Sequence, residues 1–523
     1  MKSTKPLDFG KLTPPADHGD VLVEPAAAAL RAMLDDNRRL VSTWKARVVD
    51  QDLAEVRRRV RQRVAGVESD DVPVVVTGHQ PEFIHAGVWA KHVVAVRLAE
   101  AADGRALNLV VDTDVPKQSG LSVPHLDAGR LTVSRVNLAE SAAGQPYECL
   151  PVVDRAGLDR FEWTLREALG RRFDDSMMPV FCEGLRSAGS AEDYVDQSVA
   201  ARQQVETCFG VRMLERRVSR CWLCPLFAEM LRQPERFADC YNQSLAQYRG
   251  ALGIHGRQRP IPDLIGERGR IELPVWVTGG DIKRHRLFVE SDDGRLRLYA
   301  DRRPIGALDK TALESWESAG QALSALEGVE FRPRALTLTL WARLFLADLF
   351  IHGIGGAKYD RITDTLIERY FGIAPPGMGC VSATLRLHLP RQDASVEDQH
   401  RLEHQLRDLR YNPQRHLEPV GQVAALMRAR DRAVARSISL RAGGSARRTQ
   451  RREVFEEIRS IGERMLQASP GALADLSDRL ERTRRGIQEN RIASRRDFFF
   501  ALHSRSALKD LCGALPEREA FVV

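Results

Sequence analysis

Two histidines lie in a short loop that follows the first β-branched run of the chain. Residues 77–87 read TGHQPEFIHAG, between the run PVVVT and a helical pattern that begins near Ala86. A loop of this kind presents free backbone N–H groups and the positive end of a helix dipole, which favour a phosphate or carboxylate. We therefore predict that His79 and His85 are catalytic and act on a phosphate leaving group; the alternative is that they only cap the helix. The other loop residues expected to bind substrate or nucleotide are Gly78, Gln80, Pro81 and Gly87.

Two aspartates follow the second strand pattern, ALNLVV at residues 106–111. Asp112 and Asp114 are separated by one residue, so an extended continuation of the strand sends both side chains to the same side. We predict that they are catalytic and hold a substrate amine, sugar hydroxyls or a magnesium ion, for which oxygen ligands are suitable. A helix cap or a solvated turn is the alternative.

A glycine-rich segment, HGIGGAKYD at residues 352–360, follows the apolar run LFLADLF. Gly355 and Gly356 permit close approach of the backbone to a ligand, Lys358 offers a point charge, and Tyr359 offers a ring or a hydroxyl. We predict that these four residues bind the nucleotide or the substrate. A plain helix-capping loop is the alternative.

The eight cysteines are placed unevenly in a long chain, which does not indicate a secreted disulfide framework. Cys221 and Cys224 form a Cys-x-x-Cys with Cys208 and Cys240 nearby, but a second Cys-x-x-Cys that would complete a zinc site is missing. We therefore expect reduced thiols, no zinc and no metal held by protein ligands alone.

The elements that position these residues follow an α/β pattern. Residues 73–114 read as strand, loop, helix and strand, which is a βαβ unit of a parallel sheet. Ligands of open parallel sheets lie beyond the carboxyl ends of the strands. We therefore expect the 78–87 loop and the two aspartates to face one another across one crevice. A mainly helical insertion is expected next, after which strand patterns at residues 271–277 and 284–289 predict that the sheet resumes.

From about residue 395 the sequence consists of long charged segments with apolar residues at three- and four-residue steps. This pattern predicts a coiled-coil or helical-hairpin arm, turned back on itself by RAGGSARR at residues 441–448, and a homodimer formed through it. Arginines of the arm are mixed with glutamates, which favours a salt-bridged solvated face over an RNA-binding stripe. We therefore do not expect nucleic acid as a partner.

The bulk composition excludes several classes of protein. At 523 residues the chain is too long for a single small binding module, and its 43% hydrophobic and 28% charged residues are ordinary globular values. No stretch approaches the ~18 uninterrupted apolar residues of a membrane span, so we expect a cytoplasmic protein without a membrane partner. The net charge of +7 is a mild excess that suits anionic small molecules through arginine contacts.

Taken together, these motifs resemble the bacillithiol-biosynthesis cysteine-adding enzymes. The first loop of that family reads Thr-Gly-Gln-Gln-Pro-Gly followed by an aromatic residue and a glycine, and in this chain His79 replaces the first glutamine. The family's late glycine-rich loop is similar to residues 353–359. Where the family carries a His-Asp pair after the second strand, this chain has Asp112-Thr113-Asp114-Val115. The residues of the first loop that match are Thr77, Gly78, Gln80, Pro81, Phe83 and Gly87.

The resemblance implies a Rossmann-like, nucleotidyltransferase-type parallel-sheet core with a helical insertion and a C-terminal coiled-coil arm. It also implies joining of a carboxylate, from cysteine or another amino acid, to the amine of a small sugar conjugate. Amide formation needs an activated carboxylate, so ATP or ADP with Mg²⁺ is the expected cofactor.

The domain boundaries expected from these patterns place an N-terminal helical segment first and a short tail last. They are 1–70 for the helical segment, 71–149 and 266–394 for the two halves of the core, 150–265 for the insertion, 395–500 for the arm and 501–523 for the tail. Two other classes of function stay open. A nucleotide or metabolite sensor would use the same crevice without turnover, and an assembly or RNA-binding protein would depend on the arm.

Overall fold

The computed structural model describes residues 9–116, 120–141, 143–254, 261–279, 283–441 and 447–522. The chain divides into two units. The first comprises residues 1–123, 134–387 and 496–523, and the second comprises residues 124–133 and 388–495. The loop expected to turn the arm back on itself falls mostly on residues 442–446, outside the described ranges.

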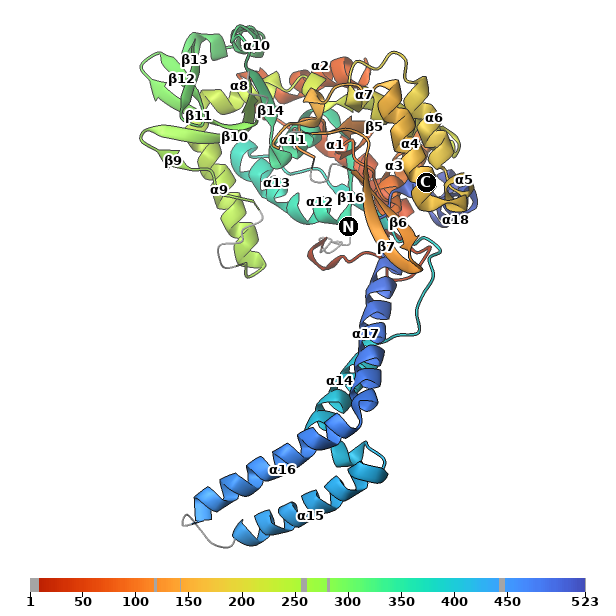
Figure 1. Cartoon of the computed structure of the whole chain (residues 1–523). Coiled ribbons are helices and arrows are strands. Elements are labelled where there is room, and N and C mark those ends of the chain that lie inside the picture. Colours follow the sequence, from red (N-terminus) through yellow and green to blue (C-terminus); the bar gives the residue numbers. More distant parts are fainter. Residues whose placement is uncertain are drawn as a thin grey trace. The chain divides into compact units, whose positions relative to one another are not determined.

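The first unit is built on a mostly parallel sheet. In spatial order its described strands are β1 (Val21–Glu24), β16 (Met378–Ala383), β15 (Leu349–His352), β4 (Val74–His79), β5 (Arg105–Val110) and β8 (Leu214–Arg217). The strands from β16 to β8 run parallel to one another, and β1 pairs with β16 antiparallel. The protein is therefore a mixed α/β structure with a parallel-strand sheet (Figure 1).

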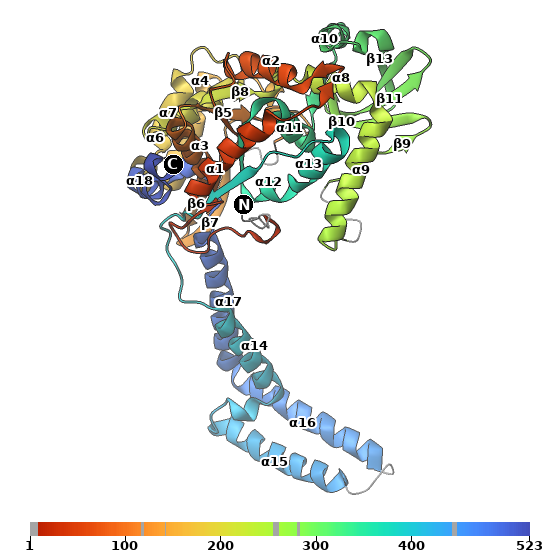
Figure 2. The ribbon, with the colours of Figure 1, turned by 180° about the vertical axis from the view of Figure 1, so that it is seen from behind.

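The predicted βαβ unit is present. Helix α3 (Ala86–Ala101) connects β4 to β5 and packs on β4, β5 and β16. Alternate residues of the two strands, Val74, Val76, Leu107 and Leu109, join the main hydrophobic cluster, to which α2 (Leu53–Ala65) also contributes. Helix α1 (Ala27–Val41), which is labelled in the view from behind (Figure 2), packs on β1 and β15. The N-terminal segment is thus not purely helical, because β1 extends the sheet beyond β16.

The region between β5 and the second sheet is mainly helical, as predicted, but it contains sheet strand β8. A hairpin of β6 (Gly120–Asp127) and β7 (Arg130–Asn137) precedes the helices. The helices of this region are α4 (Arg155–Leu169), α5 (Arg171–Asp175), α6 (Met178–Ser187), α7 (Tyr194–Thr207), α8 (Cys224–Arg232) and α9 (Pro234–Ala251).

The prediction that the parallel sheet resumes at residues 271–289 is wrong. Residues 271–278 belong to β10 (Arg270–Thr278) and residues 285–289 to β11 (His285–Asp292), and both strands lie in a separate antiparallel sheet with strand order β13-β12-β11-β10-β14. Hairpin-length connections favour antiparallel pairing, whereas a parallel return would need a long crossover. The remaining strands of this sheet are β9 (Gly266–Glu267), β12 (Arg295–Ala300), β13 (Arg303–Asp309) and β14 (Glu330–Pro333).

The chain returns to the parallel sheet through α11 (Ala335–Trp341) and a π-helical turn, Ala342–Leu346, which leads into β15. Short helices α12 (Ile354–Tyr359) and α13 (Arg361–Leu366) then lead to β16. Most of the glycine-rich segment predicted as a loop is therefore helix α12. After residue 496 the chain rejoins the first unit, where it forms α18 (Arg505–Ala514).

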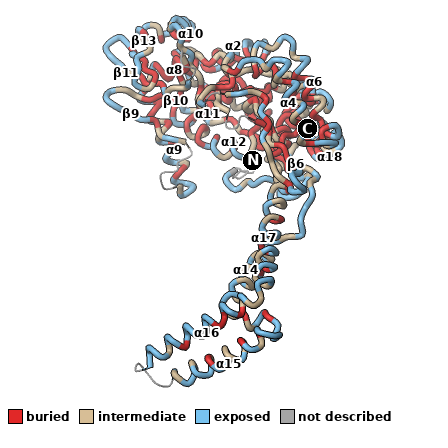
Figure 3. The backbone as a smooth tube through the Cα atoms, viewed as in Figure 1, coloured by how far each residue is buried: buried red, intermediate tan, exposed pale blue. Residues whose placement is uncertain are grey.

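The second unit consists mainly of long helices, as the charge pattern predicted. They are α14 (Val396–Tyr411), α15 (Gly421–Arg441), α16 (Arg448–Ala468) and α17 (Pro470–Ala493). Helices α15 and α16 pack on each other, and α14 packs on α17. Their buried seam includes Leu402, Leu409, Ile461 and Met465, whereas most residues of α15 and α16 are exposed (Figure 3).

Candidate functional site

One face of the parallel sheet carries a row of polar side chains near the strand ends. Thr77 of β4 is in register with Asn108 of β5, and Asn108 is in register with Glu215 of β8. Because strand side chains alternate between faces, His79 lies on the same face as Thr77. The Asn108 side-chain amide donates to Glu215 across the strands (Nδ2 to Oε2, 2.8 Å). The sheet register therefore gathers His79, Asn108 and Glu215 on one side.

The two predicted histidines line the same cavity. This cavity has a volume of about 220 Å³ and lies beside the loop that joins β4 to α3. The C-terminal segment closes part of it, because the Phe500 amide donates to the Ile84 carbonyl (2.9 Å). The described residues that line the cavity are His79, Glu82, Phe83, Ile84, His85, Val88, Pro116, Gly120, Ala139, Ser141, Tyr147, Leu150, Tyr194 and Asp497.

Burial keeps both histidines neutral, so they would offer hydrogen bonds rather than positive charge to a phosphate leaving group. It lowers the pKa of His79 well below its ordinary value, and nearby Lys91 acts in the same direction. It lowers the pKa of His85 to about 4, with a smaller contribution from Arg496. His85 also caps α3, since its Nδ1 accepts from the Gly87 amide (3.0 Å). The chemistry left to these rings is hydrogen bonding or proton transfer rather than charge pairing.

A buried lysine that sequence reasoning missed lies between β4 and the glycine-rich segment. Lys91 of α3 is 2% exposed, and its Nζ donates to the Gly78 carbonyl (2.9 Å). A Cβ built on Gly353 would lie 4.0 Å from the Lys91 side chain, so this lysine reaches the ends of both β4 and β15. Burial lowers the pKa of Lys91 to about 8, opposed by the Cys380 thiol.

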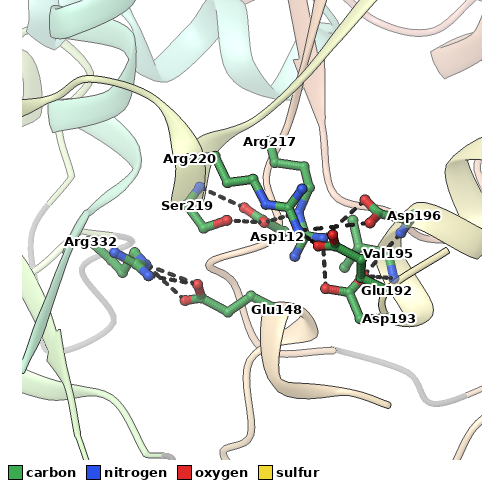
Figure 4. Close-up of polar contacts among 10 residues, drawn as sticks. All are labelled: Asp112, Glu148, Glu192, Asp193, Val195, Asp196, Arg217, Ser219, Arg220 and Arg332. Atoms are coloured by element: carbon green, nitrogen blue, oxygen red, sulfur yellow. Dashed lines mark hydrogen bonds and ion pairs between the residues drawn. The ribbon is translucent and has the colours of Figure 1, made fainter. Parts of the chain in front are cut away.

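Asp112 is held by internal contacts rather than directed toward a ligand. Its carboxylate accepts from Arg217 Nε (2.8 Å), the Ser219 amide (2.9 Å) and the Ser219 hydroxyl (Figure 4). Arg217 also pairs with Asp193 (2.6 Å) and Asp196 (3.0 Å) at the start of α7. Asp112 is 0% exposed. Its role in the structure is to tie the end of β5 to β8 and α7.

A second ion pair beside this group connects the same region to the antiparallel sheet. Arg332 of β14 contacts Glu148, with Nη2 2.9 Å from Oε2 (Figure 4). The Glu148 amide in turn donates to the Asp112 carbonyl (2.9 Å). Burial raises the pKa of Glu148, although Arg332 opposes this effect.

Asp114 does face the 78–87 loop. Its Oδ2 accepts from Gln80 Nε2 (2.9 Å), and its Oδ1 accepts from Arg284 (2.8 Å). The loop after β4 and the turn after β5 therefore meet across one crevice, as predicted from their strand ends. Pro81, next to Gln80, lines a smaller cavity that shares His79 and Tyr194 with the larger one.

The glycines of the predicted binding set differ in what surrounds them. A Cβ on Gly87 would lie 2.6 Å from the Ala383 carbonyl oxygen, and a Cβ on Gly356 would lie 2.8 Å from His352 Nδ1. A Cβ on Gly78 would lie 3.1 Å from the Leu109 carbonyl oxygen, but one on Gly355 would meet no atom within 4 Å. Gly87, Gly356 and Gly78 therefore serve close packing. Of these four, Gly355 alone adjoins open space.

The other two predicted binding residues, Lys358 and Tyr359, lie on α12 and are not among the residues that line the cavity beside His79. Tyr359 is 38% exposed, and its ring centroid lies 6.3 Å from that of Tyr248. The structure therefore brings together the first loop and Asp114. Lys91 and the pairing of β4 with β15 connect them to the glycine-rich segment.

Sequence reasoning also missed a polar stripe on α7. Tyr194, Ser198, Arg202 and Glu206 recur at four-residue spacing, which places them on one face of the helix. Tyr194, Ser198 and Arg202 line the smaller cavity together with His79 and His92 of α3. Two signals in the sequence indicate this site: the i, i+4 stripe, and the pair Lys91-His92 inside the otherwise apolar helix AGVWAKHVVAVRLA.

The Cys-x-x-Cys pair does not form a second site among the described residues. Cys221 and Cys224 are partly buried, and burial raises the pKa of each thiol to about 12. No group of three or more His, Cys, Asp or Glu side chains that could hold a metal ion is found within the described ranges. Likewise, none of the helices described is long and apolar enough to cross a membrane.

Comparison with known proteins adds no further assignment. No protein-family model matches the chain, and no curated protein sequence matches it.

Proposed function

We propose that the chain is a carbon–nitrogen ligase with a Rossmann-like core, which joins an amino-acid carboxylate to the amine of a small acceptor. The observation that carries this proposal is the strand order. In chain order the parallel strands are β4, β5, β8, β15 and β16, and their spatial order, β8-β5-β4-β15-β16, is the order 3-2-1-4-5 of a doubly wound nucleotide-binding sheet. Ligands of such sheets bind where the order reverses, which is between β4 and β15.

The residues at this reversal fit an anionic nucleotide and an amine. Lys91 reaches the ends of both strands, and its ammonium can contact a phosphate that approaches the open backbone at Gly355. The adjoining 220 Å³ cavity is lined by neutral histidines and by Glu82 and Asp497. Carboxylates suit an amine rather than a phosphate, so we assign the acceptor to this cavity and the nucleotide to Lys91 and α12.

In this proposal the residues of the chain have separate roles. When bound, ATP with Mg²⁺ supplies the activation of the carboxylate. Lys91 holds a phosphate oxygen, and the first loop positions the acceptor amine beside His79 and His85. Asp112 acts indirectly, because its contacts with Arg217 and Ser219 fix the turn that carries Asp114. The resemblance to the bacillithiol-pathway enzymes makes cysteine the first carboxylate to test.

We further propose that the second unit forms a coiled coil through which the chain dimerises. Its α15 and α16 each present a large apolar side chain to solvent, Ile438 at 59% and Phe455 at 65% exposed. Two exposed apolar residues in otherwise charged helices suit a second copy of the chain better than RNA.

The experiment combines ATP, Mg²⁺, cysteine and hydroxylamine, which serves as a generic amine, and detects hydroxamate by mass spectrometry. We expect product with the wild-type chain and a loss of about 100-fold or more in Lys91→Met. Lys310→Met is the matched control, because Lys310 is exposed and belongs to the antiparallel-sheet region. Nucleotide binding without product for any amino acid would instead support a sensor.

A further inference from the structure

A smaller cavity shares part of its lining with the acceptor site. It has room for one water-sized group, with a volume of about 20 Å³, and it shares His79, Glu82, Phe83, Ile84 and Tyr194 with the larger cavity. Its inner residues come from three elements: His92 of α3, Asn108 of β5 and Arg202 of α7. A small head group bound in this cavity would therefore meet these three side chains.

His92 is held in one orientation by a carboxylate. Its Nδ1 lies 2.6 Å from Glu206 Oε1, and both residues are 1% exposed. Arg202 donates to the other oxygen of Glu206 (2.6 Å), which fixes that carboxylate in turn. Because the Glu206 carboxylate accepts a hydrogen bond from Nδ1–H, the proton of the neutral ring is on Nδ1 and Nε2 carries the lone pair.

Acceptors are among the described buried polar atoms without a hydrogen-bond partner at this cavity, beside the Ser198 hydroxyl and Arg202 Nη2, which forms an ion pair with Glu215. Within the described part of the chain, His92 Nε2 and Asn108 Oδ1 are buried and have no hydrogen-bond partner. Buried acceptors of this kind are costly unless a donor meets them. A group that brings several N–H donors, such as a primary amine, matches this pair.

The charges around the cavity favour the same ligand. Glu206 and Glu215 both pair with the single guanidinium of Arg202, which leaves one negative charge in excess within this buried group. Burial lowers the pKa of His92, with Arg202 and Lys91 acting in the same direction and Glu206 opposing them, so the ring is neutral and its Nε2 can accept a proton. His79, the other titratable ring at the cavity, is neutral as well.

We propose that the small cavity is the amine subsite and that His92, positioned by Glu206, accepts the proton of the attacking amine. This inference rests on the proposed ligase function. The amine lone pair forms the N–C bond to the carbonyl carbon of an acyl group activated as a phosphate anhydride. The C–O bond to that phosphate breaks, and the phosphate leaves with the electron pair. The N–H proton passes to His92 Nε2, and Glu206 stabilises the imidazolium that forms.

The test compares two nucleophiles in single-turnover reactions. Glucosamine is largely protonated in weakly acidic solution and needs a base, whereas hydroxylamine reacts without one. In His92→Asn we expect amide formation with glucosamine to fall about 100-fold, and hydroxamate formation to stay within about threefold of wild type. In Glu206→Gln we expect a smaller loss with glucosamine alone. His285→Asn is the matched control, because His285 also pairs with a carboxylate, Asp301 (2.8 Å), but belongs to the antiparallel sheet.

A second measurement decides the subsite even if the wild-type chain forms no product. In nitrogen NMR of histidine-labelled protein, the His92 signal is the one absent from His92→Asn; it should show a ring protonated at Nδ1 only, and glucosamine should shift its Nε2 resonance. A missing shift overturns the amine subsite. Equal loss with both nucleophiles, or no loss with either, overturns the role of His92. A wild-type chain that forms neither product but shows the shift overturns the ligase proposal alone.

Discussion

Four basic side chains at the site are kept neutral or weakly basic by burial. His79, His85, Lys91 and His92 all have lowered pKa values, and desolvation is the largest cause in each case. Such perturbed groups cluster at functional sites more often than elsewhere. Their lowered pKa values also make the free energy of unfolding depend on pH.

Lys91 should make the protein more stable as the pH rises above 8. Its pKa is about 8 in the folded chain and 10.5 when unperturbed, so between these values the unfolded chain binds the extra proton. The free energy of unfolding therefore rises with pH across this window, by up to about 3 kcal/mol. Below pH 8 the folded chain bears the whole cost of burying the charged Lys91. In urea denaturation from about pH 7.5 to pH 10, the free energy of unfolding of wild type or of Lys310→Met minus that of Lys91→Met should rise with pH, because the opposite contribution of buried thiols such as Cys221 and Cys224 is common to all three proteins. A Lys91→Met curve parallel to wild type would contradict the assignment.

Asp112 should prove essential for stability rather than for chemistry alone. Asp112→Asn leaves the Arg217 guanidinium with one fewer carboxylate in a buried setting, and breaking such a pair typically costs about 3–5 kcal/mol. The urea midpoint should drop strongly. Asp114→Asn is the matched control, since Asp114 is 26% exposed and should lose far less. Equal midpoints for the two variants would show that Asp112 is not a structural anchor.

The position of these residues could be predicted better than their roles. That Gln80 and Asp114 meet follows from the rule for strand ends, and their 2.9 Å contact agrees with it. The partners of Asp112 could not be predicted, because Arg217 lies 105 positions away on a strand that was read as part of a helical insertion. His92 could not be recognised from the sequence, because a mostly apolar helix pattern does not indicate which of its few polar side chains face inward.

Among the secondary-structure elements, α3 packs closely against β16 at the site. Its first turn approaches β16 so tightly that Gly87→Ala would bring Cβ to 2.6 Å from the Ala383 carbonyl oxygen. Overpacking of this kind costs about 1–3 kcal/mol, and it would also move the His85 cap. We expect a lower thermal midpoint and weaker nucleotide binding in the same variant. Gly355→Ala, on a helix where Cβ meets no atom, should leave the midpoint unchanged or raise it. The opposite ranking would contradict the packing argument.

Local patterns were enough to predict β4, α3 and β5, because β-branched runs, a helical repeat and a turn signal agree there. They were not enough for β1, β8 and the second sheet. The four residues of β1 and the charged sequence LERR of β8 carry little strand signal of their own, and they become strands by pairing with β16 and β5. Such pairings are tertiary and are not encoded at short range.

For the whole molecule, the helical unit should determine the oligomeric state. We expect sedimentation analysis to find a dimer for the full chain and a monomer when a short Gly/Ser linker replaces residues 389–494. The variant Ile438→Asp/Phe455→Asp should also be monomeric, because charge on these exposed apolar positions opposes association. Exposed Arg459→Ala is the control and should stay dimeric. A full chain that is monomeric at all concentrations would contradict the proposal.

The return of the chain after residue 496 has a consequence for biosynthesis. Phe499 bridges to His85, which it follows by 414 positions, and Asp497 lines the cavity beside that histidine. At about 5–20 residues per second, a ribosome needs roughly 20–80 s to make the intervening polypeptide. During that interval the nascent 80–85 loop lacks its covering segment, so its aromatic side chains are available to chaperones. The cavity is completed only after the helices of residues 388–495 have been synthesised.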